Sequence, residues 1–197
     1  MLRTDVDVLN IDVVVKLGGG VLAHADRFSA ALTVIGTVAT TRRILIVPGG
    51  GPFADAVREV ERRIHLSDDA AHWMAVLGMD QYAHLIAARL RDASTIDDPS
   101  QIAATLDERR VPVLAPYRWM RAADPLPHSW DVTSDSIAAW VAGAVGARSV
   151  VLVKPAAVRS GLDPYFDRAL PGHVKAVVVA ADQLDRFDAV LRGSIEE

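Results

Sequence analysis

The 197-residue chain contains no cysteine, and this absence excludes several kinds of site. Without thiols there is no disulfide framework, no thiolate metal cluster and no cysteine nucleophile. Aromatic residues are also scarce, at 6% of the chain, and basic residues are not in excess, since the formal net charge is -4. Nucleic-acid binding depends on clustered Lys and Arg, so we expect no nucleic-acid partner.

Long hydrophobic runs are lacking too, although 51% of the residues are hydrophobic. A membrane-spanning helix needs about 20 consecutive apolar residues, whereas the longest apolar runs here have the length of strands and are flanked by charge. The first ten residues include Asp5 and Asp7 and have no apolar signal core. We therefore expect a cytoplasmic protein without a membrane partner, in which a doubly covered sheet or a second subunit buries the apolar residues.

Five short runs rich in β-branched residues predict strands, and they cover residues 11–17, 44–47, 111–115, 149–153 and 175–180. The runs are almost continuously apolar, as is typical of parallel strands that are buried on both faces. Segments with helical spacing separate them, so the sequence predicts an α/β sandwich in a single domain, residues 1–197.

Start signals place several of the helices. Pro52 follows three glycines and suits the first position of a helix that continues to about residue 64. Asp98 and Gln101 have the spacing of a capping box and predict a helix over residues 98–110, and another helix begins at Asp182. Residues 118–130 are expected to be the longest irregular stretch before the C-terminal part.

The helix expected over residues 68–90 is apolar on more than one side. Such a helix must be buried on most of its surface. It is either a central core helix or a dimerisation helix, and we favour the interface because a chain of this length has few other elements to cover it.

Two strands are each followed by three glycines, at residues 18–20 and 49–51. Glycines allow backbone N–H groups to approach an anion closely, and a following helix N-terminus adds positive potential. Either turn alone is compatible with a flexible connection beside an incidental Lys16. If both strands are parallel, however, the two turns lie side by side at the carboxyl edge, where α/β sheets bind ligands. Two adjacent anion sites favour phosphoryl transfer.

The densest polar cluster follows a proline-bearing loop and includes His128, Asp131 and Asp135. Asp135 lies at an expected helix start, where an ordinary N-cap is the simpler interpretation. Lys154 ends another strand, so it is expected at the same sheet edge as Lys16. Two lysines with an aspartate between them form a plausible clamp for a transferring phosphoryl group.

In this order, these residues resemble the amino acid kinase family, which includes acetylglutamate, carbamate and uridylate kinases. The resemblance spans residues 11–158 and rests on Val15-Lys16-Leu17-Gly18-Gly19, Val47-Pro48-Gly49-Gly50-Gly51-Pro52, Asp131-x-Thr133-Ser134-Asp135-Ser136-x-Ala138 and Val153-Lys154. It implies a three-layer αβα sandwich with a mainly parallel sheet. It also implies an acceptor and dimerisation lobe (residues 1–125), a reduced nucleotide lobe (residues 126–197), and a homodimer or higher homo-oligomer formed through residues 68–90.

Residues 126–139 and 163–166 look most like one branch of that family, the kinases of [5-(aminomethyl)furan-3-yl]methyl phosphate in methanofuran-type cofactor biosynthesis. The resemblance implies transfer of a phosphoryl group from ATP to this small phosphorylated, amine-bearing acceptor, which becomes a diphosphate. Mg²⁺ would be held mostly by phosphates and water.

The resemblance implies catalytic roles for three residues. Lys16 would bridge the nucleotide phosphates and the transferred group, Lys154 would act on the leaving side, and Asp135 would orient both lysines. The amides of two glycines would hold nucleotide phosphate oxygens, namely Gly18 and Gly19. The expected acceptor site comprises Gly49, Gly50, Gly51, His128, Trp130, Asp131 and Thr133. In it, Asp131 would pair with the ammonium, and Trp130 or His128 would flank the furan ring.

Other functions are compatible with the same residues. The acceptor could be a carbamate, an acyl phosphate or a nucleoside monophosphate, with Arg58 and Arg62 within reach of its phosphate. A non-catalytic nucleotide- or phosphate-binding relative is a further alternative. Its support is the turn after Lys154, which reads Pro155-Ala156-Ala157 where many family members have Asp-Gly-Val. The histidines other than His128 have no metal-ligand spacing and are expected at the surface or in local hydrogen bonds.

Overall fold

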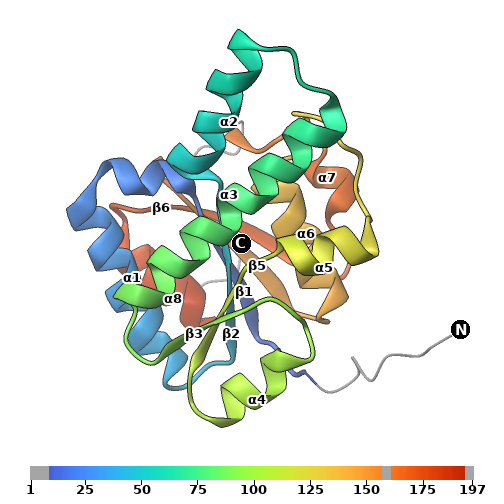
Figure 1. Ribbon diagram of the computed structural model, residues 1–197. Coiled ribbons are helices and arrows are strands. Elements are labelled where there is room, and N and C mark those ends of the chain that lie inside the picture. Colours follow the sequence, from blue (N-terminus) through green and yellow to red (C-terminus); the bar gives the residue numbers. More distant parts are fainter. Residues whose placement is uncertain (1–8, 157–160, 194–197) are drawn as a thin grey trace, which may run out of the picture.

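The computed structural model describes residues 9–156 and 161–193, and a parallel sheet lies at its centre (Figure 1). Within these ranges the sheet has six strands in the order β3-β4-β2-β1-β5-β6. The strands are β1 (Val13–Leu17), β2 (Ile44–Pro48), β3 (Ala93–Ile96), β4 (Val111–Leu114), β5 (Ser149–Lys154) and β6 (Lys175–Ala180). All neighbouring strands pair in parallel, which confirms the expected α/β class.

The edge strand β3 was not predicted from the sequence. Its four residues are Ala93, Ser94, Thr95 and Ile96, and only the first and last are buried. It pairs with β4 alone, so Ser94 and Thr95 need no apolar surroundings on both sides. A short segment of this kind lacks the continuous apolar run that marked the five predicted strands.

Helices cover both faces of the sheet and form the other two layers. One face is covered by α1 (Ala25–Ala39) and α8 (Leu184–Arg192), whose buried Phe28, Ile35 and Phe187 pack in one core cluster. The opposite face is covered by α4 (Gln101–Asp107), α5 (Tyr117–Ala123), α6 (Ser134–Ala144) and α7 (Phe166–Ala169). Figure 1 shows α1 and α8 on the left of the strands, and α5, α6 and α7 on the right. The three-layer αβα sandwich is therefore confirmed.

The long helix α3 (Asp68–Arg89) contributes to both core clusters. Trp73 and Val76 in its first half pack in the cluster on the α6 side, whereas Tyr82 and Ile86 pack in the cluster on the α1 side. This double role explains why apolar residues occur nearly all round the helix. It also contacts α2 (Gly51–Arg63), and a Cβ at Gly78 would lie only 3.1 Å from the backbone nitrogen of Ala54.

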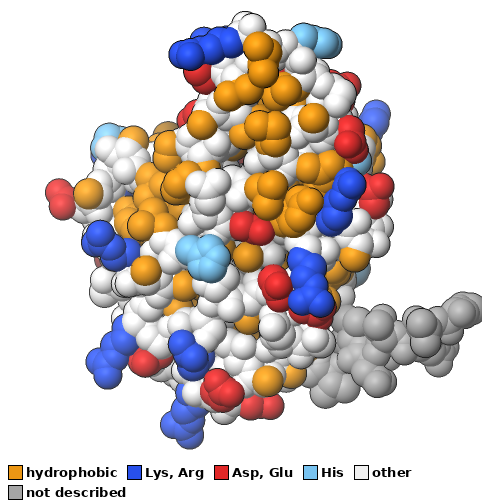
Figure 2. All heavy atoms as spheres, in the orientation of Figure 1, with side chains coloured by type: hydrophobic (Ala, Val, Ile, Leu, Met, Phe, Trp, Pro, Cys, Tyr) orange, Lys and Arg blue, Asp and Glu red, His pale blue; other side chains and the backbone are white. Residues whose placement is uncertain are grey.

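Part of α3 nevertheless remains uncovered. Met74 and Leu77 are 37% and 42% exposed, and Ile64, just beyond α2, is 61% exposed. Figure 2 shows hydrophobic side chains gathered over the upper part of this face, where Figure 1 places α2 and α3. Core packing thus accounts for most of the apolar residues of α3, but not for Met74 and Leu77, nor for the neighbouring Ile64.

Two further expectations need correction. Residues 118–130 are not wholly irregular, because α5 occupies their first part; its N-terminus is held by Asp80 of α3, which accepts a hydrogen bond from the Tyr117 N–H at 3.0 Å. The helix expected over residues 98–110 is shorter, with α4 ending at Asp107, although Gln101 accepts the predicted hydrogen bond from the Asp98 N–H. In the described part of the chain, no helix is long and apolar enough to cross a membrane.

The sheet order determines where a ligand can bind. β2, β4 and β3 extend to one side of the central strand β1, and β5 and β6 extend to the other. The strands that follow β1 are therefore added first on one side of it and later on the other side. In open α/β sheets, such a switch point leaves a crevice at the carboxyl ends of the adjacent strands. Here these ends carry Lys16, Lys154 and the glycines after β2.

Candidate active site

Strand geometry places the two lysines on the same face of the sheet. Side chains alternate between the faces of a strand, and Val14 and Leu152 belong to the core cluster on the α6 side. Lys16 and Lys154 follow these residues by two positions and therefore lie on that face as well. β1 and β5 are hydrogen-bonded neighbours in parallel register, so both lysines reach the same end of the sheet.

Asp135 lies between the two lysines at the start of α6. One carboxylate oxygen is 2.7 Å from Lys16 Nζ, and the other accepts a hydrogen bond of 2.6 Å from Lys154 Nζ. Lys16 and Asp135 are only 5% and 3% exposed. The structure thus brings together the three residues that the sequence predicted to be catalytic.

Charge and burial act in opposite directions on this group. Burial alone would raise the pKa of the Asp135 carboxyl, but the charge of Lys16 and the hydrogen bonds from both lysines outweigh it and hold the pKa below its ordinary value. Burial lowers the pKa of Lys16, and the contact with Asp135 opposes that change. Asp135 is therefore ionised at neutral pH. Since both of its oxygens are engaged, it suits the role of a charge that holds two cations rather than that of a base.

The start of α6 is held by Asp163, a residue that the sequence analysis did not place in the site. Its carboxylate accepts hydrogen bonds from the Thr133 N–H at 2.8 Å, the Thr133 hydroxyl at 2.7 Å, the Ser136 N–H at 3.0 Å and the Ser136 hydroxyl. From the same loop, the Gly161 carbonyl accepts a hydrogen bond from Lys154 Nζ. This loop therefore orients both α6 and one of the lysines. The sequence had linked residues 163–166 only to one branch of the resembled family, without a role in the site.

The two glycine turns lie in direct backbone contact. A Cβ at Gly19 would lie 2.1 Å from Gly51 Cα, and a Cβ at Gly49 would lie 2.6 Å from the Gly19 nitrogen. Gly51 also has a φ of 52°, in the left-handed region that favours glycine. No larger residue fits between the turns, so both reach the same crevice, as the sequence predicted.

The glycines are not equivalent, however. The Gly18 N–H donates to the Val153 carbonyl at 2.9 Å, and the Gly49 N–H donates to the Leu17 carbonyl at 2.8 Å. These bonds extend the sheet ladder, and neither glycine lines the cavity described below. The resemblance implied that the Gly18 amide holds nucleotide phosphate oxygens and that Gly49 belongs to the acceptor site, whereas in the structure both amides are engaged by the fold. Gly19, Gly50 and Gly51 do line the cavity, together with Gly20.

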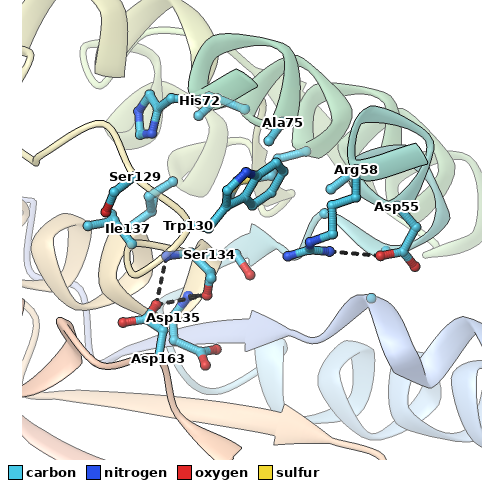
Figure 3. Close-up of a pocket in the computed structure, with 18 of the residues that line it drawn as sticks. Asp55, Arg58, His72, Ala75, Ser129, Trp130, Ser134, Asp135, Ile137 and Asp163 are labelled. Carbon is cyan, nitrogen blue, oxygen red and sulfur yellow. Dashed lines mark hydrogen bonds and ion pairs between the residues drawn. The ribbon is translucent and has the colours of Figure 1, made fainter. Parts of the chain in front are cut away.

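A cavity of about 410 Å³ connects these groups (Figure 3). Lys16, Asp135 and Lys154 lie at its floor beside the glycine turns, and Asp163 and Ser134 line it from the α6 side. Further lining residues come from α2 and α3, namely Asp55, Arg58, Asp68, Ala71, His72, Ala75, Val76 and Met79. The volume is in the range of small-molecule sites.

Trp130 forms one wall of the cavity and is held in place from α2. Its indole N–H donates to Glu61 at 2.6 Å, and the Arg58 guanidinium lies 4.5 Å from its ring centre. Arg58 also contacts Asp55 at 2.7 Å. Figure 3 shows Trp130 between His72 and Arg58. An aromatic wall and a cation therefore lie beside Lys16, Asp135 and Lys154, and Thr133 and Trp130 both line the cavity as expected.

His128 and Asp131, also expected at the acceptor, do not line the cavity. His128 instead contacts Asp69 at 2.9 Å through Nδ1 and Asp124 at 2.8 Å through Nε2, which ties its loop to α3. Its ring stacks on His72, with 4.4 Å between the ring centres. His72 is buried rather than at the surface, and burial lowers its pKa to about 4, so it is neutral at physiological pH. The Asp131 side chain is exposed.

Comparison with known proteins identifies the family. The model of the amino acid kinase family matches residues 13–156, a range that includes both glycine turns, both lysines and Asp135. The chain belongs to the amino acid kinase family. This kinase is 24% identical, over 169 residues, to the [5-(aminomethyl)furan-3-yl]methyl phosphate kinase of Methanocaldococcus jannaschii, a match that covers 86% of this chain and 74% of that relative.

Solved structures share the fold of this kinase. The uridylate kinase of Archaeoglobus fulgidus superimposes with a TM-score of 0.71 at 16% identity, covering 93% of this chain and 96% of the other. The UMP kinase of Ureaplasma parvum gives 0.66 at 13% identity, with 94% and 96% covered. Membership of the family, together with these kinase relatives, makes the chain a phosphotransferase.

The two carboxylates nearest the lysines are already engaged by the protein. Asp135 is engaged by two lysines and Asp163 by the start of α6. Among the residues that the structure describes, no three His, Asp or Glu side chains are grouped so that they could hold a metal. A Mg²⁺ ion at this kinase would therefore take most of its ligands from phosphate oxygens and water, as Mg²⁺ commonly does.

Proposed function

We propose that this kinase transfers a phosphoryl group from ATP to the phosphate of a small, amine-bearing phosphomonoester. The candidate acceptor is [5-(aminomethyl)furan-3-yl]methyl phosphate, the substrate in the name of the M. jannaschii relative. The observation that carries the proposal is one cavity that joins Lys16, Asp135 and Lys154 to an Arg58–Trp130 pair. The two lysines and Asp135 suit phosphoryl transfer. The Arg58–Trp130 pair suits an acceptor that carries both a phosphate and an aromatic ring.

The reaction needs charge neutralisation more than proton transfer. A phosphomonoester loses its second proton with a pKa of about 6, so its oxygen is already an anion at neutral pH. This oxygen forms a bond to the γ-phosphorus of ATP, while the bond from that phosphorus to the β–γ bridging oxygen breaks and ADP leaves. No general base is required, in agreement with an Asp135 whose oxygens both contact lysines. A hydroxyl acceptor would require one.

Each lysine has a defined part in this step. Lys16 lies beside Gly19 and Gly20 and would hold the transferred phosphoryl group, whose charge is spread over three oxygens. Lys154 would neutralise the charge that develops on the leaving phosphate. Asp135 keeps the two ammonium groups apart and oriented before substrates bind, which lowers the reorganisation needed during transfer.

The acceptor phosphate would lie toward Gly50, Gly51 and Arg58. The furan ring would pack against the face of Trp130, whose orientation is already set by the hydrogen bond to Glu61. Arg58 is 46% exposed and pairs only with Asp55 among the described carboxylates, so its remaining N–H groups are available to a phosphate. The nucleotide phosphates would take the side of Gly19 and Gly20.

The acceptor ammonium would pair with Asp68. Four aspartates line the cavity, namely Asp55, Asp68, Asp135 and Asp163. Arg58, the lysines and α6 engage the other three, whereas Asp68 has no ion pair with a described residue. This assignment replaces Asp131, whose exposed side chain does not line the cavity.

We also propose that a second copy of the chain packs on the exposed apolar residues of α3. Met74 and Leu77 lie on the same helix face, one turn apart, and Ile64 is exposed at the end of the neighbouring α2. Apolar side chains that the fold leaves in water gain free energy from burial at a contact between subunits. A homodimer is the simplest assembly that covers such a face on both partners.

The activity is tested by incubating the purified chain with ATP, Mg²⁺ and the aminomethylfuran phosphate. We expect ADP and the furan diphosphate in equal amounts, detected by ³¹P NMR, and much slower turnover with UMP or carbamate. Preferential turnover of UMP or carbamate would replace the proposed acceptor. Intact ATP binding without any product would support the non-catalytic alternative.

Recognition of the ammonium is tested separately with Asp68→Asn. We expect KM for the aminomethyl acceptor to rise about tenfold or more, since an ion pair within a cavity is lost. KM for the analogue that carries a methyl group in place of the aminomethyl group should stay unchanged. Asp131→Asn removes the same charge outside the cavity and serves as the matched control. A larger effect from the control would return the ammonium site to Asp131.

A further inference from the structure

A second cavity, of about 1230 Å³, lies at the opposite end of the sheet from the candidate active site. Its lining segments precede strands: residues 40–43 lead into β2, residues 91–92 into β3, and residues 109–110 into β4. The last turns of α1 and α3 complete it. We call it the arginine cavity, because six arginines line it: Arg42, Arg43, Arg89, Arg91, Arg109 and Arg110.

The charge of this cavity contrasts with that of the chain. The chain has a formal net charge of -4 and 21 Lys and Arg residues, so more than a quarter of its cations gather at one cavity. Asp92 is the one carboxylate among the lining residues. Figure 2 shows several of the Lys and Arg side chains at the lower left of the visible face. Like charges at this density repel one another, and an anion that binds between them relieves the repulsion.

Two of the guanidinium groups have no partner in the described parts of the chain. Arg89 ends α3 and Arg109 follows α4; both are exposed, and neither side chain has a hydrogen bond or ion pair to another described residue. The guanidinium N–H groups of these two arginines are therefore available to a ligand.

The other arginines are only partly engaged. Arg42 donates to the Arg192 carbonyl at 2.9 Å and pairs with Asp12 at 3.4 Å, and Arg43 pairs with Asp107 at 3.4 Å. Arg110 donates to the Ala93 carbonyl at 2.7 Å. Arg91 lies 3.3 Å from Asp92, and both side chains are exposed, so this pair adds little. A guanidinium has five N–H donors in a planar fork that matches two phosphate oxygens. The cavity thus retains many donors of the kind that binds phosphate.

We propose that the arginine cavity binds a small ligand with several linked phosphate groups, such as a nucleoside triphosphate or an inorganic polyphosphate. A single phosphate has oxygens for only a few guanidinium groups, whereas a chain of linked phosphates can contact more of the six arginines. The site is separate from Lys16, Asp135 and Lys154, so the ligand binds there without being a substrate. α3 connects the two sites, since Asp68 and His72 line the catalytic cavity and Arg89 lines the arginine cavity.

The test is calorimetric titration of the full-length chain with inorganic tripolyphosphate. We expect two binding sites, because the catalytic cavity also accepts phosphates. The double variant Arg89→Gln, Arg109→Asn should weaken one site at least about tenfold and leave the other unchanged. Asn tolerates the positive φ of 59° at residue 109, and neither arginine side chain has a hydrogen bond or ion pair to a described residue, so the variant should fold.

The matched control is Arg62→Gln, Arg63→Asn, which removes the same charge from an exposed part of α2 outside both cavities. It should leave both sites intact.

Three outcomes would overturn the proposal: equal weakening by the control, unchanged binding in the Arg89 and Arg109 variant, or equal affinity for inorganic phosphate and tripolyphosphate. Stronger binding of ATP than of tripolyphosphate at this site would support a nucleotide ligand, and the reverse an inorganic one. Because the readout is binding, failure of the kinase assay leaves this test valid.

Discussion

At the scale of single residues, the candidate site depends on a charge that the protein buries. Lys16 was expected at a strand end beside the glycine turn, and the structure buries it there against Asp135. The cost of removing a cation from water is offset by the carboxylate and by the second lysine that shares it. Lys16 is therefore both part of the proposed chemistry and part of a buried ion-pair network.

Replacing Lys16 should affect activity far more than stability. We expect Lys16→Ala and Lys16→Met to lower kcat by about 100-fold or more, since an electrostatic contact to the transferred group is lost. Asp135 keeps Lys154 as a partner, so the free energy of unfolding should fall by only about 1–3 kcal/mol. Steady-state kinetics and urea unfolding measure the two effects. A variant that keeps most of the activity would show that the site is misplaced.

The pKa of Asp80 predicts how the stability of the protein depends on pH. It is half-buried, and burial raises its pKa from 3.8 to about 6. The folded state therefore binds a proton more tightly than the unfolded state, so this residue lowers stability as the pH rises from about 4 to about 6. Asp80→Asn carries no charge and can still accept the hydrogen bond from Tyr117.

We expect Asp80→Asn to raise the free energy of unfolding by about 1–2 kcal/mol above pH 6 and to have little effect near pH 4. Urea unfolding across this pH range measures the change. Asp167→Asn, at an exposed position of α7, is the control and should shift neither value. A gain for Asp80→Asn that does not depend on pH would contradict the assigned pKa.

At the scale of elements, the position of α6 determines the position of Asp135. The carboxylate of Asp163 accepts hydrogen bonds from two residues in the first turn region of this helix, although it comes from a loop beyond β5. Asp163 is thus a positioning residue, which acts on the lysines through α6 and Asp135. This dependence on a distant loop is invisible in the local sequence around Asp135.

We expect Asp163→Ala to lower kcat at least about tenfold, and to cost about 1–2 kcal/mol of stability, as removal of a helix cap does. Asp163→Asn keeps one carbonyl acceptor and should restore part of both. Asp98→Ala removes two hydrogen bonds to Ser100, at the start of α4 and remote from the cavity, and is the control: it should lower stability without lowering kcat. Equal effects of the two alanine variants on kcat would reduce Asp163 to a purely structural role.

At the scale of the whole molecule, the proposed dimer is tested on α3. Leu77→Glu places a charge on the 42% exposed apolar position. We expect the wild-type chain to elute as a dimer in size-exclusion chromatography with light scattering, and the variant as a monomer, because burial of a carboxylate at a contact is costly. Ala122→Glu, at an exposed position of α5, is the control. A monomeric wild-type chain would refute the dimer.

The sequence by itself determined the fold class and predicted that Lys16, Asp135 and Lys154 lie together. Continuous apolar runs are typical of strands covered on both faces, and a lysine or glycine turn directly after such a parallel strand reaches the carboxyl edge of the sheet. These patterns are local, so they can be read without the tertiary structure. The edge strand β3 and the short helix α5 lack such a pattern, because their partners, β4 and Asp80, supply what the local residues do not.

Only the tertiary structure decided which groups are free to bind. The amides of Gly18 and Gly49 complete the sheet, His128 is held between two aspartates, and Asp131 faces water, whereas Asp68 and Arg58 line the cavity. A hydrogen-bonding group that is already engaged by the fold is not available to a ligand. Whether it is engaged depends on residues that are distant in the sequence. The six arginines of the second cavity meet for the same reason, since parallel strands bring the segments that precede them to one end of the sheet.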